Sequence, residues 1–226
     1  MNDCICISLM TAFLVAAPVP AAETNTNRIA SAIPRIQFEE VELTDVIESL
    51  AKQADINYVF DPKTGFDGVA DPHKKPQPRI SLSWTNLTAE QALRGVLNYY
   101  DLQLLEIKGT TVCKVTLTNQ TVKAVDAQWI QQGTNTIIPL IQMNSVPLDE
   151  ALRNLAAQAR IQITLDTASA RNSNLNRSSQ PIVSFRWKTL TARQAIAALL
   201  ENYELLMSSD PDDRIHIFRR EPGASK

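Results

Sequence analysis

The sequence predicts an α+β fold made of two tandem copies of one β-α-β-β-α-β-β domain. Two long segments recur in the same order along the chain, which indicates a duplication. Within each copy, stretches with the period of a strand alternate with stretches that have the period of a helix. Because short amphipathic helices cannot bury themselves, they must pack on small sheets. We expect domain 1 at residues 33–120, a linker at residues 121–133 and domain 2 at residues 134–218.

The duplication is visible as residue identities at nearly constant offsets. Residues 36–61 match residues 141–166 at an offset of 105, with ten identities in 26 positions. At ordinary composition, chance would give about one or two identities in this block. Residues 81–102 match residues 184–205 at an offset of 103, with ten identities in 22 positions. The offset changes in the loop between the blocks, where a difference in length costs little.

The first half of each copy is expected to form a strand, a helix and a second strand. Ile36 and Phe38 alternate with polar neighbours, as in a half-buried strand. Residues 43–54 and 148–159 then place apolar side chains at helical spacing. Alternating segments follow, and they end on Asp61 in copy one and on Asp166 in copy two.

The second half of each copy is expected to contain a strand, a capped helix and a closing hairpin. Residues 88–91 (Thr-Ala-Glu-Gln) and 191–194 (Thr-Ala-Arg-Gln) both have the form of a capping box. In this motif the Thr hydroxyl accepts a hydrogen bond from the helix N-terminus, and the Gln side chain accepts one from the Thr N–H. The closing hairpins are expected within residues 102–117 and 204–218.

Residues 1–22 are expected to be a secretory signal peptide. Ile5 to Ala17 is mostly apolar, carries no charge and is too short to span a membrane. The small or modest residues of Val19-Pro20-Ala21 fit a cleavage site, although Met1-Asn2-Asp3 lacks the usual positive charge. Cys4 and Cys6 would leave with the signal. Since one remaining cysteine cannot form an internal disulfide, stability must come from packing.

The composition is that of a globular protein without a basic excess. The chain of 226 residues is 44% hydrophobic and has a formal net charge of −2. Nothing in this balance would neutralise a phosphate backbone, so nucleic acid is not an expected partner.

The repeated segments resemble the secretin and TonB short N-terminal (STN) domain. The helix-to-strand half of the family pattern is similar to residues 43–61 and 148–166, and the Leu-Thr-Ala-x-Gln-Ala half is similar to residues 87–102 and 190–205. The resemblance implies two helices packed between a two-stranded and a three-stranded sheet. It also implies a location in the periplasm or at the outer membrane. Since only eight residues follow Phe218, we expect STN-like modules without the channel that such domains precede.

We expect no catalytic, cofactor-binding or metal site in this chain. His73 lies in a Pro-rich loop with too few neighbouring ligands for a metal. His216 alternates with Ile215 and Ile217 on the last strand, where no nucleophile is placed to pair with it. Cys113 lies on the closing hairpin of copy one and is expected to be a buried thiol.

Two pairs of repeated residues are expected to be structural. Asp61 and Asp166 could suggest acid–base chemistry, but each follows a strand, where aspartate commonly begins a turn. Trp84 and Trp187 recur in both copies and are interpreted as packing positions. The loops after Asp61 and Asp166 do not repeat, so contacts particular to this protein are expected there. Lys74 and Lys75 form a small basic cluster with Arg79, and the second loop carries Arg171 and Arg177.

The expected function is that of a non-enzymatic docking module in the cell envelope. Strand edges of small mixed sheets can accept another chain. The resemblance implies a protein partner from a secretin-type secretion system or a TonB-dependent receptor, and self-association remains open. The alternative is binding of cell-wall glycan or peptide by the long loops. Enzymatic activity is a third hypothesis, which would require polar residues that converge between the copies. No cofactor or small-molecule substrate is expected.

Overall fold

A computed structural model describes residues 32–66, 77–120, 127–131, 136–165, 181–209 and 214–219. Three groups of predicted features lie outside these residues. They are the signal peptide, the loop of copy one with His73, Lys74 and Lys75, and the loop of copy two with Asp166, Arg171 and Arg177.

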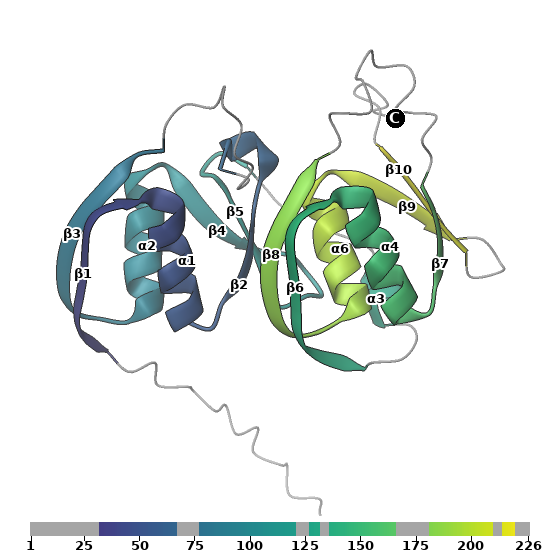
Figure 1. The fold of residues 1–226 in the computed structure, drawn as a ribbon, viewed down its shortest axis with the longest axis horizontal. Helices are drawn as coiled ribbons and strands as arrows, with labels where there is room; N and C mark the ends of the chain where they lie inside the picture. Colours follow the sequence, from purple (N-terminus) through teal and green to yellow (C-terminus); the bar gives the residue numbers. More distant parts are fainter. Residues whose placement is uncertain are drawn as a thin grey trace, which may run out of the picture.

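The described chain folds into two similar α+β halves with the predicted order of elements, which confirms the fold class (Figure 1). Copy one contains β1 (Ile33–Glu42), α1 (Leu43–Gln53), β2 (Asn57–Phe60), the 3₁₀ turn η1 (Pro62–Thr64), β3 (Arg79–Leu87), α2 (Ala89–Tyr99), β4 (Leu102–Glu106) and β5 (Val112–Leu117). Copy two contains β6 (Ile137–Pro147), α4 (Leu148–Ala159), β7 (Gln162–Leu165), β8 (Ile182–Thr191), α6 (Ala192–Asn202), β9 (Leu205–Ser209) and β10 (Arg214–Arg219). Helix α3 (Ala127–Gln131) lies between the copies in sequence.

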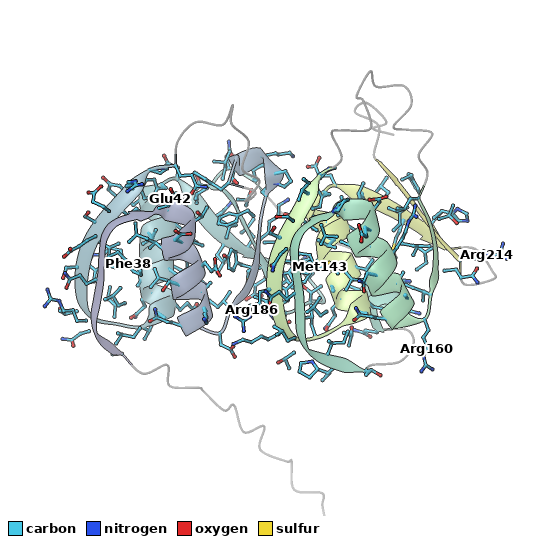
Figure 2. The ribbon with its side chains drawn as sticks, in the orientation of Figure 1. Phe38, Glu42, Met143, Arg160, Arg186 and Arg214 are labelled. Carbon is cyan, nitrogen blue, oxygen red and sulfur yellow. The ribbon has the colours of Figure 1, made fainter. Side chains whose placement is uncertain are left out.

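Each copy places its two helices between two small sheets (Figure 1). In copy one, β1 and β3 form an antiparallel pair, and the second sheet has the order β2-β5-β4. β2 runs parallel to β5, while β4 runs antiparallel to it. Copy two repeats this topology with the pair β6-β8 and the order β7-β10-β9. Phe38 of β1 and Met143 of β6 occupy corresponding places in the two halves (Figure 2).

The backbone repeats as closely as the sequence. Non-glycine residues with positive φ are uncommon because Cβ crowds the backbone there. Within the described residues, four pairs of such residues lie at equivalent positions of the two copies, and the first pair lies in the β-bulges of β1 and β6. The pairs are Glu40 and Ser145 (φ 51° and 52°), Asp55 and Arg160 (55° and 57°), Asn86 and Thr189 (58° and 56°), and Asp101 and Glu204 (56° and 53°). The duplication therefore preserved the turns as well as the core.

Both predicted capping boxes are confirmed. In α2, the Gln91 N–H donates to Thr88 Oγ1 over 3.1 Å, and the Thr88 N–H donates to Gln91 Oε1 over 2.9 Å. In α6, the corresponding bonds between Thr191 and Gln194 measure 3.2 and 2.8 Å. Because these bonds satisfy orphan N–H groups, they fix where both helices begin.

The two copies share part of one hydrophobic core. The core of copy two includes Val59, Ile107 and Val112, which belong to the three-stranded sheet of copy one. The opposite face of that sheet packs on α1 and α2 through residues such as Val115. The sheet β2-β5-β4 is therefore covered on one face by its own helices and on the other by copy two.

The segment predicted as a linker contains helix α3, which packs into copy two. Trp129 and Ile130 are only 3% and 5% exposed. The Arg193 guanidinium of α6 lies 5.1 Å from the centre of the Trp129 ring and donates to the Trp129 carbonyl. In the predicted hairpin turn between β4 and β5, Gly109 has φ +80°, and a Cβ there would come within 2.9 Å of Ile130. The segment thus holds the copies together through packed side chains.

Because the core is shared, we expect the two copies to unfold in one cooperative transition. Separating them would expose Val59, Ile107 and Val112 to water at a cost that rises with the apolar area uncovered. Calorimetry of a chain that starts at Glu23 should therefore give equal calorimetric and van't Hoff enthalpies. Two resolved transitions would contradict a shared core.

Candidate functional site

At the boundary between the halves, a strand edge of copy one meets a strand edge of copy two. β2 is an edge strand of the three-stranded sheet of copy one, and β8 belongs to the two-stranded sheet of copy two. The side-chain amide of Asn57 bonds to both backbone groups of Lys188. Asn57 Nδ2 donates to the Lys188 carbonyl, and the Lys188 N–H donates to Asn57 Oδ1, each over 2.7 Å. This amide thus takes the place that a residue of a neighbouring strand would take.

Side chains of copy two also bond to the outer edge of β2. Trp187 Nε1 donates to the Tyr58 carbonyl over 2.7 Å, and Asn202 Nδ2 donates to the Phe60 carbonyl over 3.0 Å. Two exposed ion pairs flank them, Lys188 with Asp55 and Lys63 with Glu204. These bonds fix the orientation of one copy relative to the other.

A buried ion pair lies on the covered face of the copy-one sheet. Lys114 and Asp61 are 6% and 1% exposed, and Lys114 Nζ is 3.0 Å from Asp61 Oδ2. The Thr116 hydroxyl also donates to Asp61 Oδ2, and the Lys63 N–H donates to Asp61 Oδ1. Asp61 therefore begins a turn, as predicted, and in addition neutralises a buried ammonium group. The arrangement holds structure together and presents no reactive group to solvent.

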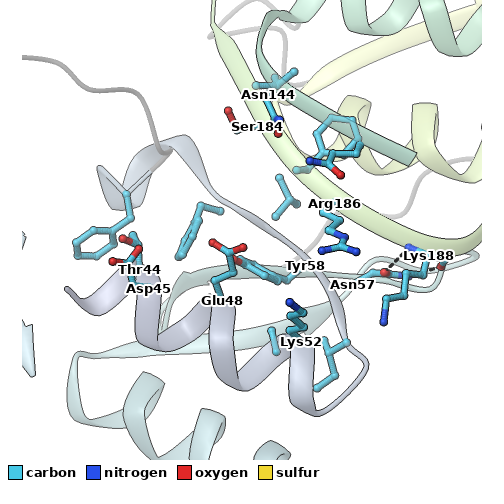
Figure 3. Close-up of a pocket in the computed structure, with 18 of the residues that line it drawn as sticks. Thr44, Asp45, Glu48, Lys52, Asn57, Tyr58, Asn144, Ser184, Arg186 and Lys188 are labelled. Carbon is cyan, nitrogen blue, oxygen red and sulfur yellow. Dashed lines mark hydrogen bonds between the residues drawn. The ribbon is translucent and has the colours of Figure 1, made fainter. Parts of the chain in front are cut away.

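A cavity of about 580 Å³ opens between the copies beside these contacts (Figure 3). One wall is helix α1, and the opposite wall is the outer face of β6 and β8. We call this cavity the inter-copy groove. From α1 it is lined by Thr44, Asp45, Glu48 and Lys52, from β2 by Asn57 and Tyr58, and from β6 and β8 by Gln142, Asn144, Ser184, Arg186 and Lys188.

The α1 wall of the groove carries three acidic residues and one lysine, Lys52, so its net charge is negative. Glu42, Asp45 and Glu48 are exposed there, and none of them forms an ion pair within the described part of the chain. Burial, together with the charges of Glu48 and Asp45, raises the pKa of the Tyr58 phenol. That hydroxyl therefore stays protonated and can donate a hydrogen bond. Figure 3 shows Glu48 and Lys52 projecting from α1 toward the side on which Arg186 and Lys188 lie.

The groove also borders an open strand edge. Because successive residues of a strand direct their N–H and C=O groups to opposite sides, Arg186 and Ser184 face the same side as Lys188. Lys188 is bonded there by Asn57. Within the residues that the structure describes, no group of copy one bonds to the backbone of Arg186 or Ser184. Both lie on the groove and are exposed.

The candidate residues that were singled out from the sequence, where the structure describes them, do not lie together in one site. His216 is half-buried on β10 between the buried Ile215 and Ile217, as the alternation predicted. Trp187 is fully buried, whereas Trp84 is half-buried against Gly95 of α2. In the described ranges, no three His, Cys, Asp or Glu side chains gather in a way that could hold a metal ion.

Cys113 is half-buried on β5, and its thiol is expected to react slowly. Burial and the nearby charge of Glu106 raise the pKa of this thiol to about 11. Because the thiolate is the reactive form, its alkylation at about pH 8 should be slower than that of an ordinary thiol by about two orders of magnitude. The chain starting at Glu23, in which Cys113 is the only cysteine, allows the test with iodoacetamide. The same chain in denaturant is the control, and equal rates would contradict the prediction.

The groove residues were not predicted from the sequence. Four groove residues lie on repeated elements, but the other copy carries a different residue at each equivalent position. They are Glu48, Asn57, Arg186 and Lys188. Those equivalents are Arg153, Gln162, Ser83 and Thr85. Differences between the copies on otherwise repeated faces were the available signal.

The sequence matches no model of a known protein family and no curated protein. None of the helices in the described segments is both long and apolar enough to cross a membrane.

Proposed function

We propose that this protein is a non-enzymatic docking module of the cell envelope that binds another protein in the inter-copy groove. The observation that carries the proposal is the groove itself, where an acidic helix faces an open strand edge between two firmly joined domains. Exposed strand edges beside pockets are a recurrent mode of protein recognition. The groove residues belong to different copies, so the site exists only in the duplicated protein.

The proposed setting is the periplasm or the outer membrane of a secretin-type or TonB-linked system. It is supported by the STN-like residue pattern, which occurs twice, and by the signal-like segment at residues 1–22. In this setting the two copies act as one rigid body that presents the groove to a component of the larger machine. Catalysis has no part in the proposal.

Site-specific photocrosslinking in the native host tests the proposed function. A benzophenone amino acid replaces Arg186 in the groove, and a matched variant carries it at Arg94, an exposed residue of α2 outside the groove. We expect the Arg186 variant alone to crosslink a secretin or TonB-dependent receptor component, identified by mass spectrometry. Recovery of both variants without any envelope component would overturn the proposal.

A further inference from the structure

We infer that the inter-copy groove takes an extended, basic peptide segment, which adds as a strand to the free edge of β8. The inference deepens the proposed function, on which it rests, by naming the chemistry of the partner. Three observations carry it: the Asn57 amide on Lys188, the open backbone positions beyond it, and the unpaired acids of the α1 wall.

The Asn57 side chain shows what the edge of β8 accepts. Its amide offers a carbonyl oxygen and an N–H group side by side and bonds to both backbone groups of Lys188 over 2.7 Å. A peptide backbone offers the same pair of groups at every second residue. An extended segment that starts beside Asn57 would therefore reach Arg186 and then Ser184 with the same donor and acceptor pattern.

The cavity supplies the room and the chemistry for alternate side chains of the bound segment. In an extended peptide, every second side chain points the same way. On one side these would face Asp45 and Glu48, whose carboxylates are exposed and not ion-paired within the described residues. Lys or Arg at these places would form charge-assisted bonds with the carboxylates. Within the described residues, the groove charges without an ion pair are the acids Glu42, Asp45 and Glu48 and the cations Lys52 and Arg186. Because the acids outnumber the cations and lie along α1, basic side chains are favoured where the segment faces this wall.

The edge of β8 is open at the groove because, among the described strands, only β6 on its other side pairs with it through the backbone. Copy two contacts β2 through side chains here, since the Trp187 indole donates to the Tyr58 carbonyl and the Asn202 amide of α6 donates to the Phe60 carbonyl. The cavity borders this edge at Lys188, Arg186 and Ser184, and Thr44, Asp45 and Glu48 of α1 line its other wall. Unpaired strand edges are usually protected by charges or covering elements. Here a charged helix faces the edge across a cavity, which limits access to one extended segment.

Selection from a phage-displayed library of random peptides tests this inference on the chain that starts at Glu23. We expect the bound pool to be enriched in Lys and Arg at alternate positions. Glu48→Arg places in the groove the residue that copy two carries at its equivalent, Arg153, and should weaken the selected peptides by about tenfold or more. Glu150→Gln alters the counterpart of Asp45 in copy two, outside the groove, and should leave binding unchanged.

Backbone N-methylation of the best synthetic peptide separates strand addition from binding by side chains alone. We expect affinity to fall at every second N-methylated residue, since only alternate N–H groups face β8. Hydrogen exchange at the amides of Arg186 and Ser184 should also slow in the complex. A pool without basic enrichment, an insensitive Glu48→Arg variant, or a scan without alternation would each overturn the inference. In those cases, crosslinking of an envelope component at Arg186 could still succeed, and the proposed function would stand. If instead the peptides are selected as expected but no envelope component is crosslinked, only the proposed function is refuted.

Discussion

Replacement of Asp61 by alanine is expected to destabilise the protein by about 3–5 kcal/mol. Asp61 is 1% exposed and holds the ammonium group of Lys114 at 3.0 Å on a face that copy two covers. Without the carboxylate, a buried positive charge would remain uncompensated, and the Thr116 hydroxyl and the Lys63 N–H would lose their acceptor. Chemical denaturation of the chain that starts at Glu23 measures the loss.

Two matched variants show whether the loss comes from the buried charge. Asp61→Asn combined with Lys114→Met removes both charges and keeps an acceptor for Thr116, so most of the lost stability should return. Asp55→Ala breaks the Lys188 pair, whose side chains are 53% and 44% exposed, and should cost at most about 1 kcal/mol. A cost for Asp61→Ala as small as that for Asp55→Ala would show that the Lys114 charge is solvated.

The fold within each copy could be predicted because the repeated residues are the ones that form it. The capping threonines and the apolar faces of the helices recur at constant offsets, so self-comparison separates them from the rest of the chain. The register of β10 was also visible, since Ile215 and Ile217 alternate with His216 and are buried. Local patterns of this kind depend only on near neighbours in sequence.

The inter-copy groove could not be predicted by the same comparison. A head-to-tail contact uses different faces of the two copies, so the residues that form it need not resemble each other. Asn202 bonds to β2, whereas its counterpart Tyr99 is 82% exposed. Ala197 is fully buried at a position where copy one carries Arg94. Duplication reveals what the copies share, and the groove lies where they differ.

The same difference between the copies explains why the α2 face of copy one, which no described residue of copy two covers, is polar. Glu90 and Arg94 of α2 form an exposed ion pair on the face that corresponds to the buried face of α6. In repeat proteins, a polar outer face on the terminal unit keeps the array soluble. The α2 face therefore has the character of a cap, and the inter-copy groove is the polar concavity that the pairing of the copies itself creates.

Replacement of Trp187 by alanine is expected to cost about 3–5 kcal/mol and to weaken the coupling between the copies. The side chain is fully buried, stacks on Phe185 with ring centres 3.9 Å apart, and donates to the Tyr58 carbonyl of copy one. Its loss would leave a cavity in copy two and an acceptor of β2 without its donor. Calorimetry should show a lower melting temperature and a van't Hoff enthalpy that falls below the calorimetric value.

The equivalent substitution in copy one is the matched control for this prediction. Trp84 is half-buried against Gly95 and bonds to no other copy within the described residues, so Trp84→Ala should cost less and leave the enthalpy ratio unchanged. Trp187→Phe keeps an aromatic ring on Phe185 but removes the indole donor, and should cost about 1–3 kcal/mol. If both alanine variants were equally destabilising and neither changed the enthalpy ratio, the indole bond would not couple the copies. The two equivalent tryptophans thus contribute differently to the free energy of unfolding, because only Trp187 lies at the contact between the two domains.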